Sequence, residues 1–359
     1  MSYEKERDEV INWLKHPNEL GKEPSKIEFV KEFTDPEGIH CLIFKFKAGL
    51  LSPWCIAVHS DSGIFSEEEK YDEKRDVEQA QALVDYLKQY WKNVALNAEE
   101  SKKRAEKAKP FCAFVLKAEP KFEPEEFLKL YEEEWGEKLK GVDEDKDEEK
   151  DGTDARIYSN ENGLNIVLGY MDMRVPGEEA EECAQYNFFW KEAVETTKTH
   201  KAHEVVTVMG VGEIKDKAIF YAKALTTLCR MDNNIGVYTN GVVYEPKMFH
   251  SMSKVILEGT LPIPVLVWCG VGKDEKGVSC WTDGMKTFGF DELEMVNVQN
   301  KQASEIHSIM LFIVDYCINQ DISFHDGEEV GLTAGVKAKI KKSKGVNVDM
   351  DGETLKISF

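Results

Sequence analysis

A charged stretch near residue 100 limits how this chain can fold. Residues 99–109 read EESKKRAEKAK, contain no large apolar side chain and stop at Pro110. Such a stretch either extends a helix or links two folded parts, because it has nothing to place in a hydrophobic core. A chain of 359 residues is also long for a single core. We therefore predict an N-terminal module over 1–98, a charged linker over 99–110 and a C-terminal domain over 111–359.

The first 98 residues predict a small α+β module. An apolar stripe predicts a helix over 3–15, which must end before Pro17. Apolar alternation and short buried-type runs predict three strands, and helical spacing predicts a second helix. The expected strands cover residues 27–33, 39–46 and 54–58, and the second helix covers 74–98. The predicted order is α-β-β-β-α.

The C-terminal domain shows one order of elements twice. The first copy, over 111–212, predicts a strand, a helix, a hairpin around Asn160–Gly163, a long helix over 178–199 and a strand. A connecting helix over 213–230 leads to the second copy, over 235–359, which starts with a strand at 235–239. The second copy then predicts a helix, a hairpin around 273–277, another helix and further strands in the tail.

The repeated order is β-α-β-β-α-β, which is the ferredoxin-like arrangement. We therefore predict an α+β fold with a small N-terminal module followed by two tandem ferredoxin-like units. This internal duplication is inferred from element order, because the residues themselves show no repeat.

The charge balance excludes some classes of partner. The formal net charge is −21, which disfavours binding to nucleic acid and to anionic lipid. The same charge favours a protein partner with a basic surface through electrostatic steering. The N-terminus has no apolar signal region, no run is long enough to cross a bilayer, and the eight cysteines are scattered. We expect a soluble cytoplasmic protein with free thiols, and the sequence gives no oligomeric state.

Several motifs resemble cofactor or metal sites but are incomplete. Residues 209–213, MGVGE, lack the third glycine of a dinucleotide-binding loop, so a tight turn between strand and helix is expected. His200 and His203 have no identifiable third metal ligand. Cys269 and Cys280 flank the second hairpin turn and are expected to face each other as buried thiols. The acidic run 141–154 is expected to be a solvated loop. We predict no cofactor and no metal.

One aromatic and polar cluster stands out as a candidate binding surface. Its tryptophans lie on neighbouring predicted strands, and its first tyrosine lies on the opening strand of the same unit. An aromatic face on a small sheet either packs against helices or binds a ligand or partner. The cluster consists of Tyr238, Asn240, Tyr244, Trp268, Trp281 and Asp283.

The region from about residue 111 to the C-terminus resembles an uncharacterised family, domain-of-unknown-function family 4261. The resemblance is carried mainly by GVY at 236–238, LPIP at 261–264, WTDGM at 281–285, DGEEVG at 326–331 and the tail 345–357. It implies a bacterial cytoplasmic protein and supplies no catalytic residues. The N-terminal module is additional to it.

Two functions fit these observations. The first is a non-enzymatic cytoplasmic binding protein, of an immunity-type or regulatory kind, that recognises a protein partner. The alternative is a small-molecule-binding protein or enzyme whose site lies in the cleft between the duplicated C-terminal modules. The absence of a complete catalytic constellation favours the first.

Overall fold

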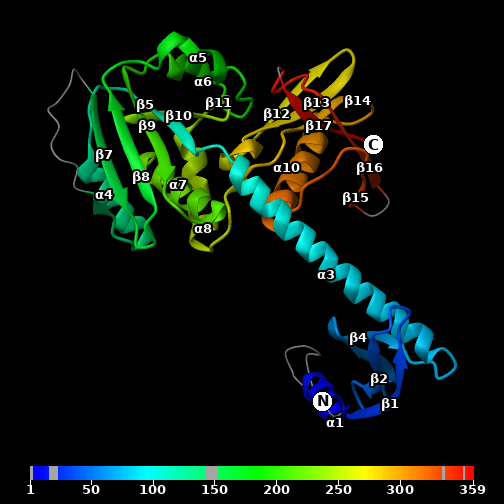
Figure 1. The fold of residues 1–359 in the computed structure, drawn as a ribbon. Coiled ribbons are helices and arrows are strands. Elements are labelled where there is room, and N and C mark those ends of the chain that lie inside the picture. The colour runs from blue at the N-terminus through cyan, green and yellow to red at the C-terminus, as the bar shows by residue number, and fades with distance from the viewer. Residues whose placement is uncertain (1–2, 16–22, 143–152, 334–335, 351) are drawn as a thin grey trace. The chain divides into compact units, whose positions relative to one another are not determined.

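The computed structural model describes residues 3–15, 23–142, 153–333, 336–350 and 352–359 (Figure 1). The chain forms two compact units, residues 1–99 and 100–359. The helix α3 runs from Asp76 to Lys107 and contributes to both. The charged stretch near residue 100 therefore extends this helix as far as Lys107. Within the described ranges, no helix combines the length and the apolar character of a membrane span.

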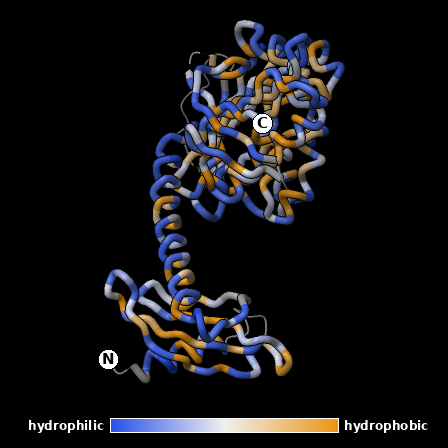
Figure 2. Tube along the Cα trace, turned by 90° about the vertical axis from the view of Figure 1, so that its right-hand side faces the viewer, coloured by the Kyte–Doolittle hydropathy of each residue, from blue (hydrophilic) through white to orange (hydrophobic). Residues whose placement is uncertain are grey.

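The first unit is an antiparallel sheet between two helices. The strands β1 (Lys26–Thr34), β2 (His40–Lys47), β3 (Cys55–Ser60) and β4 (Gly63–Lys70) pair in sequence order. Leu42 and Phe44 of β2 pack with α1 (Tyr3–Leu14), whereas its Cys41 and Ile43 pack with α3. Both faces of β2 are covered, which explains its continuous apolar run. The hydrophobic colour of this unit follows its strands (Figure 2).

The sequence prediction missed the strand β4. Its sequence, GIFSEEEK, ends in three glutamates and a lysine, so the apolar alternation is short. Pairing with β3 through the turn at Ser60–Gly63 supplies the hydrogen bonds that fix it as a strand.

The second unit contains two sheets, of which the first has seven strands. Its strand order is β11-β10-β5-β9-β8-β7-β6. The strands are β5 (Cys112–Lys117), β6 (Lys140–Gly141), β7 (Thr153–Ser159), β8 (Asn165–Met171), β9 (Ala202–Met209), β10 (Asn234–Thr239) and β11 (Val242–Tyr244). One face packs on α4 (Pro124–Trp135), α7 (Ile214–Leu228) and α8 (Pro246–Leu257), and the other on α5 (Glu179–Ala184) and α6 (Ala193–Thr197) (Figure 1).

The second sheet has six strands in the order β12-β13-β14-β17-β16-β15. The strands are β12 (Trp268–Asp274), β13 (Gly277–Asp283), β14 (Leu293–Val298), β15 (Glu329–Thr333), β16 (Val336–Lys344) and β17 (Glu353–Ser358). The helix α10 (Ala303–Gln320) packs against β12 and β13. Short helices α9 (Ile263–Leu266) and η2 (Met285–Phe288) lie at the end of the sheet where β12 begins and β13 ends.

Two elements differ from the prediction, one in each of the two expected copies. The strand at 235–239, expected to open the second copy, is β10, and it pairs with β5 of the seven-stranded sheet. The predicted long helix 178–199 is wrong: the structure has η1 (Pro176–Glu178), α5 and α6, with residues 185–192 outside them. Asn187 interrupts the helix because its side chain bonds to the backbone of Val243, Phe189 and Trp190.

The α+β class is confirmed, with antiparallel pairing throughout the first two sheets and mixed pairing in the third. The ferredoxin-like layout of the two units stays a prediction. The strand β14 was not predicted at all. The acid Glu294 is buried between the apolar residues Leu293 and Met295, so it interrupts the apolar run that would have indicated a strand.

Candidate functional site

The structure divides the six predicted residues among four different surroundings. Tyr238 lies beneath α5, where its hydroxyl donates a 2.7 Å hydrogen bond to Glu179 and its ring stacks on Phe114. Burial raises the pKa of Tyr238 strongly. This tyrosine joins α5 to the sheet and is not open to a ligand.

Tyr244 and Trp268 form a buried aromatic pair. Their rings meet edge-to-face with centroids 5.7 Å apart, and both side chains are almost fully buried. The indole nitrogen of Trp268 has no hydrogen-bond partner among the described residues. The pair belongs to the core, and only the Trp268 ring reaches the exposed aromatic rings described below.

Trp281 packs flat on its own sheet. Its indole covers Gly270 and Gly272 of β12, so closely that a Cβ at Gly270 would overlap the ring. The two glycines leave the space that the indole fills. Trp281 therefore has a packing role that requires glycine on the neighbouring strand.

Asn240 and Asp283 do come together, in a pocket of about 230 Å³ between the two sheets of the second unit. Asn240 lies in the turn from β10 to β11 and donates a hydrogen bond of 2.9 Å to the carbonyl of Leu266. Asp283 ends β13 and approaches the same turn, since a Cβ at Gly241 would lie 2.7 Å from its Oδ2 atom.

The electrostatics of this pocket centre on two acids. Burial raises the pKa of Asp283, while the positive charges of Lys109 and Lys286 oppose the shift. Burial also raises the pKa of Glu292 to about 7. Glu292 is fully bonded, because it accepts from the Thr282 hydroxyl and from the backbone N–H groups of residues 284, 285 and 286. Glu292 shapes the loop after β13, whereas the side chain of Asp283 makes no hydrogen bond or ion pair with any residue that the structure describes.

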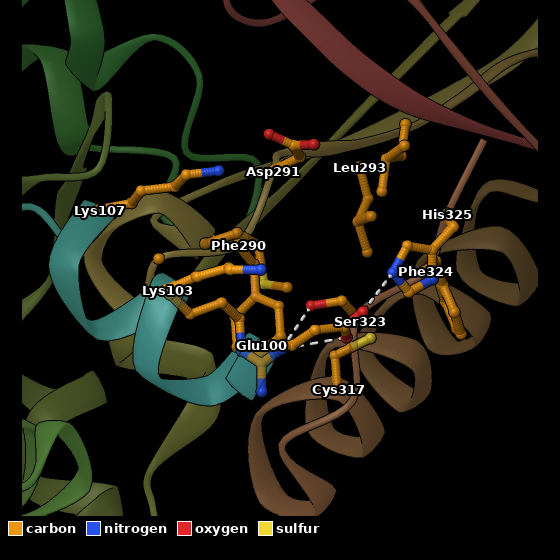
Figure 3. Close-up of a pocket in the computed structure, with 14 residues that line it drawn as sticks. Glu100, Lys103, Lys107, Phe290, Asp291, Leu293, Cys317, Ser323, Phe324 and His325 are labelled. Atoms are coloured by element: carbon orange, nitrogen blue, oxygen red, sulfur yellow. Dashed lines mark hydrogen bonds and ion pairs between the residues drawn. The ribbon is translucent and has the colours of Figure 1, made fainter. Parts of the chain in front are cut away.

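A second pocket, of about 220 Å³, lies beside the last turns of α3 (Figure 3). Arg104 donates hydrogen bonds of 2.7 Å to the Ser323 hydroxyl and to the Asp321 carbonyl, and its guanidinium lies over the Phe290 ring. Across the pocket His325 contacts Glu100, with 2.9 Å between Nε2 and Oε1. These charged groups bind one another, so this pocket fixes the end of α3 to the second unit.

Sequence reasoning missed the most exposed aromatic group of the second unit. We call residues 186–190, YNFFW, the aromatic segment; it joins α5 to α6. Tyr186, Phe188 and Phe189 are 52%, 46% and 60% exposed, whereas Asn187 and Trp190 are buried. The signal was present as four aromatics in five residues, but a predicted helix over 178–199 hid it. Its shape depends on the Asn187 bonds to the backbone.

The aromatic segment extends into a larger cluster. The Phe188 and Phe189 rings lie 4.2 Å apart, and both contact Trp268 and His307 of α10. Burial lowers the pKa of His307, which favours the neutral form of this imidazole. The surface is therefore apolar at its centre and uncharged.

The histidines and cysteines that resemble metal or redox sites in the sequence make other contacts in the structure. His200 contacts the Thr197 carbonyl through Nδ1 and accepts from the Val175 amide through Nε2, while His203 contacts the Met173 carbonyl. The described residues contain no group of three or more metal-ligating side chains. Cys269 pairs with Thr282 and Cys280 with Val271, so the two thiols are offset along the hairpin. Most of the acidic run 141–154 lies outside the described residues.

Comparison with known proteins identifies one family. Neither curated proteins nor solved structures match the chain. A family model described as Domain of unknown function (DUF4261) matches residues 281–358, which run from the end of β13 to β17 and include Asp283, Glu292 and Glu294. The N-terminal module lies outside this match. The predicted resemblance to domain-of-unknown-function family 4261 is therefore confirmed over residues 281–358, the greater part of the six-stranded sheet.

Proposed function

We propose that this protein is a binding protein whose aromatic segment inserts into a protein partner with a basic surface. The observation that carries the proposal is the display of three large aromatic rings on a fixed loop. Aromatic side chains dominate the energetics of protein interfaces because they bury large areas at little entropic cost. Tyr186, Phe188 and Phe189 are exposed together, although the same loop buries Trp190.

The loop is held in place before any partner binds. The Asn187 amide donates to the Val243 carbonyl at 2.8 Å, and its oxygen accepts from the backbone of Phe189 and Trp190. A preorganised loop loses less conformational entropy on binding. This rigidity favours recognition of a partner over a passive surface loop.

The charge around the aromatic segment favours a basic partner. Residues 176–198 contain six glutamates and two lysines. One of the lysines, Lys198, already pairs with Glu195, and Arg174 pairs with Glu181. The chain on both sides of the aromatic segment is therefore net acidic. We call it the acidic rim, and it would steer a partner that has lysines and arginines around an apolar pocket. The strongly negative net charge acts in the same direction.

The test is co-purification with the tagged full chain from its native host, comparing three proteins. We expect the wild-type chain to retain a partner. The amount of partner that the variant F188S/F189S retains should be lower by about tenfold or more. The matched control is Tyr90→Ser, which removes a 49% exposed aromatic side chain from α3. The control should retain the partner, and rising salt should release it from the wild type.

A partner that F188S/F189S retains as well as the wild type would contradict the role of the aromatic segment. A partner whose binding is indifferent to salt would contradict the acidic rim. Circular dichroism of each variant should match the wild type, because the substituted side chains are exposed.

A further inference from the structure

The pocket that holds Asn240 and Asp283 has an unused charge of each sign, and we propose that it binds a free α-amino acid or an equally small aminocarboxylate. We call it the Asp283 pocket. It is independent of the aromatic segment and of any protein partner. Its walls come from the ends of β5, β10 and β13, from η2 and from residues 109–111.

The negative group is the carboxylate of Asp283. This side chain is half-buried, lines the pocket, and forms no hydrogen bond or ion pair with any residue that the structure describes. Even a partly buried carboxylate loses some of its hydration, so a donor beside it is favourable. Its neighbours show the contrast: Glu292 accepts four hydrogen bonds, whereas Asp283 accepts none. The donors that Asp283 lacks would come from the ammonium group of a ligand.

The positive group is the ammonium of Lys109. This lysine lines the same pocket and has no acidic partner within 4 Å in the described parts of the chain. Its backbone is fixed, because its N–H donates to the Lys286 carbonyl at 3.0 Å. Lys286 itself pairs with Asp349, so Lys109 is the cation that remains open to a ligand carboxylate.

Other classes of ligand fit the charges less well. A purely cationic ligand would meet the ammonium groups of Lys109 and Lys286, and a purely anionic ligand would meet Asp283. A zwitterion satisfies both signs with one small molecule. The cavity of about 230 Å³ is small, and the hydroxyls of Tyr221 and Thr239 lie at its wall, 3.3 Å apart. These features suit an amino acid better than a nucleotide or a larger cofactor.

The experiment uses the full chain and measures binding by thermal shift and calorimetry with the common L-α-amino acids as probes. We expect at least one to raise the melting temperature. Two derivatives of that amino acid should fail to bind. One is its amide, which lacks the carboxylate, and the other is its N-acetyl derivative, which lacks the ammonium group. Binding at the proposed pair requires both charges at once.

Two variants place this binding in the pocket. D283N should weaken the affinity by about tenfold to about a hundredfold, because it removes the anion that pairs with the ammonium. K109M should weaken it by a smaller factor and should reduce the preference for the free acid over its amide. D315N, which changes an exposed aspartate on α10, is the matched control and should bind as the wild type does.

Failure of every amino acid to bind the wild type would overturn the proposal. So would an amino acid that D283N and K109M both bind with unchanged affinity. D283N and K109M keep the approximate size of side chains that make no hydrogen bond or ion pair with described residues. Neither substitution should therefore change the melting temperature of the ligand-free protein, so a loss of binding can be told from unfolding.

Discussion

The two sheets of the second unit stabilise buried charge in different ways. In the seven-stranded sheet, Lys117 of β5 is fully buried and pairs with Glu204 of β9 at 2.6 Å, while Asn234 of β10 accepts from the same ammonium. In the six-stranded sheet, Glu292 and Glu294 have no such cation. They accept hydrogen bonds from backbone N–H groups and threonine hydroxyls.

Glu294 is the clearest example of a buried carboxylate that is stabilised by hydrogen bonds instead of by a cation. It accepts from the backbone N–H groups of residues 346, 347 and 348 and from the Thr354 hydroxyl. The ion pair of the first sheet joins three strands, whereas the glutamates of the second sheet each fix a loop to a strand. The seven-stranded sheet therefore uses charge to select strand neighbours, whereas the six-stranded sheet uses it to shape loops.

The largest expected effect comes from breaking the ion pair. Lys117→Met leaves Glu204 buried without its cation, so unfolding should become easier by about 3–5 kcal/mol. The double variant K117M/E204L should recover much of this loss, because no buried charge remains. Urea unfolding of the full chain measures both, and Lys201→Met, at an exposed pair, is the control. Equal losses for the single and double variants would contradict this account.

The second effect tests the loop glutamates. Glu294→Ala removes the acceptor of several buried donors and should cost about 2–4 kcal/mol. Hydrogen exchange should quicken most at residues 346–348, whose N–H groups lose their partner. Glu353→Ala, at an exposed position of β17, should change neither measurement. Exchange that speeds equally throughout the sheet would show that Glu294 does not act on the loop.

The third effect depends on pH. The pKa of Glu292 is about 7 in the folded protein and near 4.5 in the unfolded chain. Between these values the folded state holds a proton that the unfolded state has released, so stability falls as the pH rises through this window. Wild type should lose on the order of 1–3 kcal/mol relative to Glu292→Gln between pH 4.5 and 7. Parallel stability curves for the two proteins would contradict the raised pKa.

The smallest effect compares one glycine in each sheet. Gly270→Ala would place a Cβ in the Trp281 ring and should cost about 1–2 kcal/mol. Gly169→Ala, in β8, meets only Val205 atoms at 3.8 Å and should change stability by about 0.5 kcal/mol or less. Thermal unfolding of the two variants measures the difference. A loss for Gly270→Ala as small as that for Gly169→Ala would mean that the Trp281 indole moves aside easily.

Local signals in the sequence predicted many elements well. Helix α4 follows from its apolar spacing and its proline start, and the β12–β13 hairpin follows from the turn chemistry around Gly277. The strands β4 and β14 were missed because acidic residues interrupt their alternation. The helix over 178–199 was predicted from composition, while a single side chain, Asn187, ends it through bonds to a distant strand.

The candidate site was predictable only in part. Asn240 and Asp283 lie in the same pocket, although 43 positions separate them in the sequence. Lys109, which completes the charge pair, was assigned to a linker because nothing local connects it with β13. The aromatic segment was visible as a composition, but its exposure depends on which rings the fold buries.

The sequence alone determined the α+β class, the helical character of most apolar stripes and the negative charge, because these depend on local periodicity and on counts of side chains. Tertiary structure decided that β10 pairs with β5, that the charged stretch near residue 100 continues α3, and that Asp283 and Lys109 line the same pocket. These outcomes depend on contacts between residues far apart in the chain. Such contacts are selected by the packing of whole sheets and leave no local period in the sequence.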